Sequence, residues 1–137
     1  MERIGSARIA RPGRGVSLIT IGRGVRVAHA AAEQLSQRSV EAEVIDLRSL
    51  TPLDSETILQ SVRRTSRAVV IDLAPRGFGV TGEITALVGE QAFDYLDAPV
   101  LRIGAPMVPV PFSASLESLV TPKAEDIVDA VLGELSR

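Results

Sequence analysis

The chain has 137 residues, 45% of them hydrophobic and 23% charged, with a formal net charge of −2. This composition is typical of a soluble globular protein, and the length suits one domain, which we expect to span residues 1–137. The balanced charge and the content of one Tyr, three Phe and no Trp argue against a nucleic-acid-binding surface. No apolar run approaches the roughly 20 residues that cross a membrane. We therefore expect neither a nucleic-acid nor a membrane partner, and an N-terminus without the apolar core of a secretory signal favours a cytoplasmic location.

The predicted strands are short apolar runs rich in β-branched residues. Four of them are typical of buried parallel strands and lie at residues 16–21, 42–47, 68–73 and 100–103. A shorter run at residues 7–10 precedes a glycine-rich turn that is too short for a parallel crossover. This run is therefore a candidate edge strand with antiparallel pairing.

Between the strands, apolar residues recur at helical spacing. Four helices are predicted. The first covers about 25–36, and the second begins at Thr51 or Asp54 with Pro52 in its first turn. The third covers about 81–92, and the fourth follows Thr121 and Pro122. The proline-rich segment 105–112 is expected to be irregular. Alternating strands and helices predict an α/β fold, a three-layer α/β/α sandwich around a mostly parallel, about five-stranded sheet.

The turn after the run at 16–21 has part of a dinucleotide-binding fingerprint. Gly22 and Gly24 lie between a predicted strand and a predicted helix, and Asp46 ends the next strand. Val27 stands where the fingerprint requires a third small residue, and Arg23 interrupts the turn with a long side chain. A structural strand-to-helix turn is the favoured interpretation, and a free-standing nucleotide-binding module using Gly22, Gly24 and Asp46 is the alternative.

A complete G-x-G-x-x-G occurs later, at Gly77, Gly79 and Gly82. Asp97 follows at about the spacing of the fingerprint, but it precedes the next predicted strand instead of ending it. We expect Asp97 at the opposite end of the sheet from these glycines, which favours a loop that opens a helix over a nucleotide site.

No constellation of residues predicts catalysis or metal binding by this chain. His29 is the only histidine, its helical face carries charged residues, and the chain has no cysteine. No serine lies in a G-x-S-x-G motif. Acidic pairs such as Glu41 and Glu43 are interpreted as solubilising charges. We expect no catalytic residue, no metal ligand and no cofactor-binding residue here.

Three segments nevertheless resemble a known family. They are "AEVIDLRSLTPLDSETILQSVRRTSRAVVID", "APRGFGVTGEITALVGEQAFDYLDAPVLRIGAP" and "VPVPFSASLE". Together they resemble the C-terminal domain of the β subunit of thiamine-diphosphate-dependent 2-oxoacid dehydrogenases, the E1 component, within the transketolase C-terminal domain superfamily. The resemblance implies a mixed five-stranded sheet whose first strand is antiparallel to the others, and a glycine turn of purely architectural role.

The resemblance also implies what the complete enzyme does. It would oxidatively decarboxylate a 2-oxoacid such as pyruvate or a branched-chain 2-oxoacid, or cleave acetoin, and transfer the acyl group to a lipoyl-acyltransferase. Thiamine diphosphate and Mg²⁺ would bind outside this chain, between the α subunit and a pyrimidine-binding domain of the β subunit expected upstream of Met1. The chain alone would then be an assembly domain without activity.

The implied partners are the E1 α subunit, a second β subunit and the peripheral subunit-binding domain of the acyltransferase, E2. An interface of this kind suits an apolar centre with a charged rim. The expected interface residues are the apolar or loop positions Phe78, Glu83 and Phe112, and an acidic rim for a basic partner made of Glu125, Asp126 and Asp129.

Overall fold

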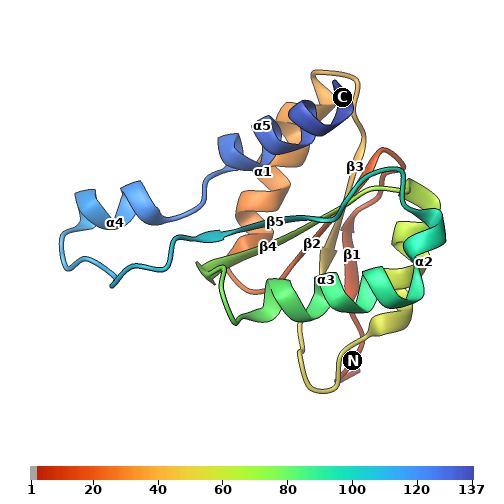
Figure 1. Cartoon of the computed structure of the whole chain (residues 1–137), viewed down its shortest axis with the longest axis horizontal. Coiled ribbons are helices and arrows are strands. Elements are labelled where there is room, and N and C mark those ends of the chain that lie inside the picture. The colour runs from red at the N-terminus through yellow and green to blue at the C-terminus, as the bar shows by residue number, and fades with distance from the viewer. Residues whose placement is uncertain (1–2) are drawn as a thin grey trace.

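The computed structural model describes residues 3–137 and has a mixed five-stranded sheet in the order β1-β3-β2-β4-β5 (Figure 1). The strands are β1 (Arg8–Arg11), β2 (Val16–Thr20), β3 (Ala42–Asp46), β4 (Ala68–Pro75) and β5 (Leu101–Ala105). β1 pairs antiparallel with β3, and the other pairings are parallel. The predicted α/β class and the antiparallel edge strand are confirmed.

Helices cover both faces of the sheet. They are α1 (Gly24–Ser36), α2 (Ser55–Thr65), α3 (Val80–Gln91), the short 3₁₀ helix η1 (Phe93–Tyr95), α4 (Ala114–Val120) and α5 (Ala124–Leu135). α1 and α5 lie on one face, and α2 and α3 lie on the other (Figure 1). α4 lies away from the sheet, on a segment that extends outward from β5.

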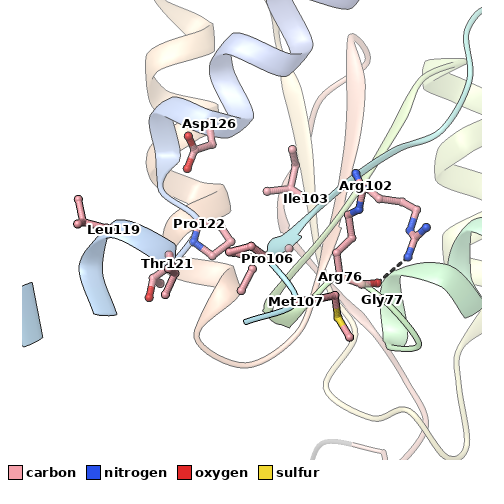
Figure 2. Close-up of a pocket in the computed structure, with 13 residues that line it drawn as sticks. Arg76, Gly77, Arg102, Ile103, Pro106, Met107, Leu119, Thr121, Pro122 and Asp126 are labelled. Carbon is pink, nitrogen blue, oxygen red and sulfur yellow. Dashed lines mark hydrogen bonds between the residues drawn. The ribbon is translucent and has the colours of Figure 1, made fainter. Parts of the chain in front are cut away.

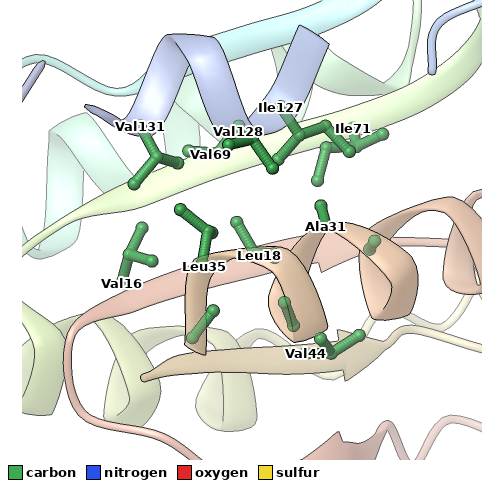
Figure 3. Close-up of a cluster of buried hydrophobic side chains, with 13 residues drawn as sticks. Val16, Leu18, Ala31, Leu35, Val44, Val69, Ile71, Ile127, Val128 and Val131 are labelled. Carbon is green, nitrogen blue, oxygen red and sulfur yellow. The ribbon is translucent and has the colours of Figure 1, made fainter. Parts of the chain in front are cut away.

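Each strand supplies side chains to two separate cores because successive residues point to opposite faces. On β2, Leu18 belongs to the core under α1 and α5, whereas Ile19 belongs to the core under α2 and α3. Figure 3 shows the first core, in which Leu35 of α1 and Val131 of α5 meet the side chains of the sheet. Burying each such side chain contributes about 1.5–3 kcal/mol, so the two cores fix the layers.

Asp54 sets the start of α2. Its Oδ1 accepts a hydrogen bond from the backbone N–H of Thr57 at 3.1 Å, and its Oδ2 accepts one from the Thr57 hydroxyl at 2.7 Å. The backbone N–H of Ala7 also donates to Oδ2, at 2.8 Å, and so ties the N-terminal segment to this helix. Of the two predicted caps, Asp54 is therefore the one used. The prediction that Pro52 lies in the first turn is wrong, because α2 begins at Ser55.

Three polar contacts join α2 to strands β2 and β3. The Ser17 hydroxyl lies 2.6 Å from that of Ser61 and 2.7 Å from that of Thr65, all three residues being buried. Glu43 is only 4% exposed and accepts a 2.8 Å hydrogen bond from Arg64 Nη2. The interpretation of Glu43 as a solubilising charge is thus wrong. Its carboxylate can occupy a buried strand position because the Arg64 guanidinium neutralises its charge.

The end of the chain departs from the prediction at two points. Residues 114–120 form α4 inside a stretch for which no helix was predicted. α5 begins at Ala124, two residues after the expected Thr121–Pro122 start, because Asp126 Oδ2 accepts a hydrogen bond from the backbone N–H of Lys123 at 2.8 Å. The side chain of Asp126 thus caps the helix in which it lies.

Candidate interaction surface

The surface begins where β4 and β5 end side by side. Pro75 pairs with Ala105, and the backbone N–H of Arg76 donates to the Ala105 carbonyl at 2.9 Å. Arg102 then fixes the loop that follows β4, because its Nη2 donates to the Arg76 carbonyl at 2.6 Å (Figure 2). Its Nε also donates to the Thr81 hydroxyl at 3.3 Å. One side chain of β5 therefore holds both the loop and the first turn of α3.

Two glycines allow the chain segments to approach each other here. A Cβ atom on Gly104 would lie 2.9 Å from the Arg76 Cα, and one on Gly77 would lie 2.9 Å from Met107 Sδ. Phe78, the residue after Gly77, has a φ of 57° and a fully exposed side chain. The loop thus packs its backbone against the residues after β5 and presents Phe78 outward.

The segment 106–120, called the arm below, is apolar and exposed. Pro106, Pro109 and Pro111 lack N–H donors, so the arm does not continue the sheet. Its exposed apolar side chains, with relative exposures between 47% and 109%, are Met107, Val108, Val110, Phe112, Leu116 and Leu119. Apolar surface concentrated in this way is typical of interaction sites.

The helix inside the arm has no core within the chain. α4 has seven residues, no side-chain hydrogen bond from Ser113 to its first amides, and no buried residue in the part of the chain that the structure describes. Helices this short are marginal in water unless tertiary packing supports them. A contact that buries Leu116 and Leu119 would supply that support.

A cavity of about 590 Å³ separates the base of the arm from the body. Its walls come from the loop after β4, the end of β5, the arm and the start of α5 (Figure 2). Met107 and Leu119 give it apolar walls, whereas Arg102 and Asp126 give it charged ones. A cavity with these walls suits a side chain of a partner protein more than a small apolar ligand.

The structure places the six expected interface residues at one end of the sheet, but not in one cluster. Phe78 and Phe112 are both fully exposed, on the loop and on the arm, and Asp126 lines the cavity. Glu125 and Asp129 are exposed on α5, and Glu83 is exposed on α3 without lining the cavity. Sequence reasoning missed Met107, Leu119, Arg76 and Arg102, and the one available signal was the alternation of apolar residues and prolines after residue 105.

The first glycine turn has an architectural explanation. Gly22 has a φ of +63°, and a Cβ atom on Gly24 would collide with the Thr20 hydroxyl. Asp46, the residue of the nucleotide alternative, already accepts a hydrogen bond from the Arg48 N–H at 3.1 Å and lies 3.8 Å from Arg8 Nη2. Backbone geometry and packing therefore require these glycines without any ligand.

The second glycine motif also behaves as expected. The backbone N–H of Asp97 donates to the Ser66 carbonyl at 2.9 Å, and its carboxylate lies 3.9 Å from Arg67 Nη1. These partners directly precede β4, whereas Gly77 follows it. Asp97 and the glycines thus lie at opposite ends of the sheet.

The remaining features are not sites. His29 is half-exposed and lies 3.7 Å from Glu33, one turn along α1. Within residues 3–137, no three His, Cys, Asp or Glu side chains lie close enough together to hold a metal ion. The same residues include no helix long and apolar enough to cross a membrane.

Comparison with known proteins matches the family model "Transketolase, C-terminal domain" to residues 5–127. The β-1 subunit of the mitochondrial pyruvate dehydrogenase E1 component of Arabidopsis thaliana is 49% identical over 127 residues, which are 93% of this chain and 35% of that protein. The β subunit of acetoin:2,6-dichlorophenolindophenol oxidoreductase of Bacillus subtilis is 46% identical over 129 residues, 94% of this chain and 38% of that protein. The chain thus spans a little over a third of the length of these two curated relatives.

A solved structure described as a split gene transketolase in an inactive beta4 tetramer superposes with a TM-score of 0.79 at 26% identity. The match covers 98% of this chain and 43% of that one. A 2-oxoglutarate:ferredoxin oxidoreductase from Magnetococcus marinus, at 12% identity and a TM-score of 0.61, covers 93% of this chain and 19% of that one and shares the fold alone. Family model, relatives and fold agree: the chain belongs to the transketolase C-terminal domain family.

Proposed function

We propose that this chain serves as the C-terminal assembly domain of an E1 β subunit in a thiamine-diphosphate-dependent 2-oxoacid dehydrogenase. The complete enzyme would oxidatively decarboxylate a 2-oxoacid such as pyruvate or a branched-chain 2-oxoacid, or cleave acetoin, and pass the acyl group to a lipoyl-acyltransferase. Relatives named as pyruvate dehydrogenase and acetoin oxidoreductase β subunits support this assignment. The observation that carries the assembly role is the arm, whose apolar side chains are exposed beside two complete cores.

Catalysis would take place outside this chain. The described residues hold no cluster that fits Mg²⁺, and the one histidine is a surface residue paired with Glu33. These residues do not fit a metal-bound diphosphate, so thiamine diphosphate and Mg²⁺ would be held by other parts of the complete enzyme. The proposal includes the cytoplasmic location expected from the sequence, although the name of the Arabidopsis relative places that protein in mitochondria.

The proposed partners match two kinds of surface. Phe78 and Phe112 are fully exposed aromatic side chains, and aromatic anchors commonly supply most of the binding energy of an interface. They suit the E1 α subunit and a second β subunit, and the tetramer named for the split gene transketolase supports pairing between β-type chains.

The third proposed partner is the peripheral subunit-binding domain of E2. Glu125, Asp126 and Asp129 are exposed in the first half of α5 and would form the acidic rim for this basic domain. Glu83, exposed on α3, adds a further negative charge at the same end of the sheet.

Titration calorimetry tests the partner assignment. The chain is titrated with the E2 peripheral subunit-binding domain from the same genome, and separately with NAD and with thiamine diphosphate plus Mg²⁺. We expect saturable heat with the E2 domain and none with NAD or thiamine diphosphate. Salt should weaken the binding, because it screens the charges of the rim. Charge reversal by Asp129→Lys should weaken it further, whereas Glu90→Lys, at an exposed position outside the rim, should not. Heat with NAD and none with the protein would contradict the proposal and revive the nucleotide-binding alternative.

A further inference from the structure

Residues 108–120 of the arm are held to the body only through the two ends of the segment. Each hydrogen bond that the structure gives these residues has its partner inside 106–121. For example, the Thr121 hydroxyl donates to the Glu117 carbonyl, and the Val108 N–H donates to the Pro106 carbonyl. Glu117 is the only charged residue of the arm, and it makes no ion pair within the described chain. Swinging residues 108–120 as a unit therefore breaks no hydrogen bond between arm and body.

The helix inside the arm has one apolar side. Leu119 and Val120 lie three and four residues after Leu116, which places these three side chains on one side of α4. Ala114 and Ser118 lie on the opposite side. Leu116 is 53% exposed and Leu119 is 75% exposed. A helix of seven residues is marginal in water by itself, so this apolar side requires a surface on which to pack.

The cavity at the arm base offers such a surface within the same chain. Ile103 of β5 and Pro122 before α5 supply apolar wall on the body, while Leu119 and Val120 line the cavity from the arm. Figure 2 shows Leu119 on α4 and Ile103 on β5, with the base of the arm between them. Closing the arm over the cavity removes apolar surface of both walls from water, and such burial is the main favourable contribution to packing.

The charges around the cavity are compatible with closure. Arg76 is exposed, and its guanidinium has no hydrogen-bond or ion-pair partner within residues 3–137. Asp126, the acidic residue of the cavity wall, already accepts the backbone N–H of Lys123 at the start of α5, where the helix dipole favours a negative charge. A closing arm thus brings the carboxylate of Glu117 toward an unpaired cation.

We propose that the arm is a hinged strap. In the unassembled chain it closes over the cavity and packs the apolar side of α4 against the wall around Ile103, and on assembly it extends as in Figure 1. The loop residues at its two ends absorb the change in backbone dihedral angles, as in other hinges. The extended state rests on the proposed function, because extension serves assembly, whereas closure is a property of this chain alone.

Tryptophan fluorescence tests closure, because the chain has no tryptophan of its own. Leu119→Trp places the probe on the apolar side of α4, and Phe78→Trp places a matched probe at a fully exposed position outside the arm. We expect acrylamide to quench the Leu119→Trp chain several times less efficiently than the Phe78→Trp chain, with emission at shorter wavelength. Equal quenching of the two chains would show that the arm stays extended and would overturn the inference.

Second substitutions in the Leu119→Trp chain identify the contact. Leu116→Ser removes an apolar side chain from the closing side of α4 and should raise the quenching toward that of Phe78→Trp. Ala114→Ser, on the opposite side of the same helix, should leave the quenching unchanged. Closure within one chain does not depend on concentration, so the shielding should survive dilution. Shielding that disappears on dilution would assign the arm to a second molecule, and the strap would be wrong.

A disulfide staple tests whether closure opposes assembly, because the chain has no cysteine of its own. Ile103→Cys combined with Leu119→Cys should oxidise to a bond within one chain. Binding of the E1 α subunit from the same genome should then be about tenfold weaker or more, because only an extended arm is competent to bind, and reduction should restore it. The matched control combines Ile103→Cys with Gly133→Cys, an exposed position of α5 with open space around its Cβ atom. The control should form no such bond and should bind alike before and after reduction.

The two proposals fail separately. If the E1 α subunit binds the stapled chain as tightly as the reduced one, closure does not oppose assembly, and the strap is wrong while the assembly role stands. If neither the E1 α subunit nor the E2 domain binds the chain in either state, the proposed function fails, and the quenching of the Leu119→Trp chain still decides whether the arm closes.

Discussion

Arg102 donates a 2.6 Å hydrogen bond to the backbone carbonyl of Arg76, and this contact joins the edge strand β5 to the loop that carries Phe78. Its Nε also reaches Thr81 in the first turn of α3. The arm base, the loop and α3 are therefore positioned through one guanidinium. Disturbing it should loosen the proposed interface without touching either core.

Arg102→Met should destabilise the chain by about 1.5–3 kcal/mol, the usual contribution of hydrogen bonds from a charged donor. Amide exchange should accelerate in residues 76–81 more than in β2. Urea denaturation and hydrogen exchange measure both effects, with Arg38→Met, at an exposed position in the turn after α1, as the control. Unchanged exchange in residues 76–81 would show that Arg102 does not hold the loop.

Gly24→Ala should destabilise the fold by about 1–3 kcal/mol, because its Cβ collides with the Thr20 hydroxyl beneath α1. Thr20→Ala removes that hydroxyl, which has no hydrogen-bond partner within residues 3–137. The double variant should therefore recover part of the lost stability in a double-mutant cycle. Strictly additive losses would contradict the packing explanation of this glycine turn.

Glu43→Ala should cost about 1.5–3 kcal/mol, because it leaves Arg64 and the N–H of Gly13 without their acceptor. Glu41→Ala, two residues away on an exposed side chain, should cost clearly less than Glu43→Ala, as expected of a solvent-screened surface ion pair. Thermal or urea unfolding of the two variants compares their losses in the free energy of unfolding. Equal losses would show that burial does not distinguish the two carboxylates.

Asp54 makes stability depend on pH at the acid end. Partial burial raises the pKa of Asp54. The hydrogen bonds from Thr57 and from the backbone N–H of Ala7 together lower the pKa by more than burial raises it, so the pKa of Asp54 is below its ordinary value. A carboxyl whose pKa is depressed by folding stabilises the native state above its unfolded pKa, about 3.9 for aspartate. That contribution is lost as pH falls through the folded pKa.

Asp54→Ala should therefore cost about 0.5–2 kcal/mol near neutral pH, the usual cost of losing an N-cap, and less below pH ~3. Urea unfolding of the wild type and the variant between about pH 2.5 and 7, a range that spans this titration, measures the difference in their free energies of unfolding. A gap between the two proteins that stays constant over this range would contradict the assigned ionisation of Asp54.

Most of the layered fold was predictable, because it depends on local patterns. β-branched runs such as 16–20 form strands wherever they can be buried, and Asp54 is a favourable N-cap by residue type alone. The antiparallel edge strand followed from the shortness of the turn after it. The resemblance to E1 β subunits rested on contiguous segments and agrees with the relatives and the family model.

The misses depend on contacts distant in sequence. The burial of Glu43 depends on Arg64, 21 residues away, which no local pattern indicates. α4 has too few helical turns and too little internal packing to be recognised from periodicity. The cavity at the arm base forms only when the ends of β4 and β5 meet the start of α5, so Arg76 and Leu119 carried no signal of their own.

A chimeric enzyme is the decisive test of the assembly role. The matching 129 residues of the Bacillus subtilis acetoin:2,6-dichlorophenolindophenol oxidoreductase β subunit are replaced by this chain, and the chimera is expressed with its α subunit. We predict an assembled complex that reduces 2,6-dichlorophenolindophenol with acetoin, whereas the chain alone should not. Phe112→Ser in the chimera should weaken assembly. A folded chimera that does not assemble with its subunits would contradict the claim that this chain is an E1 β assembly domain.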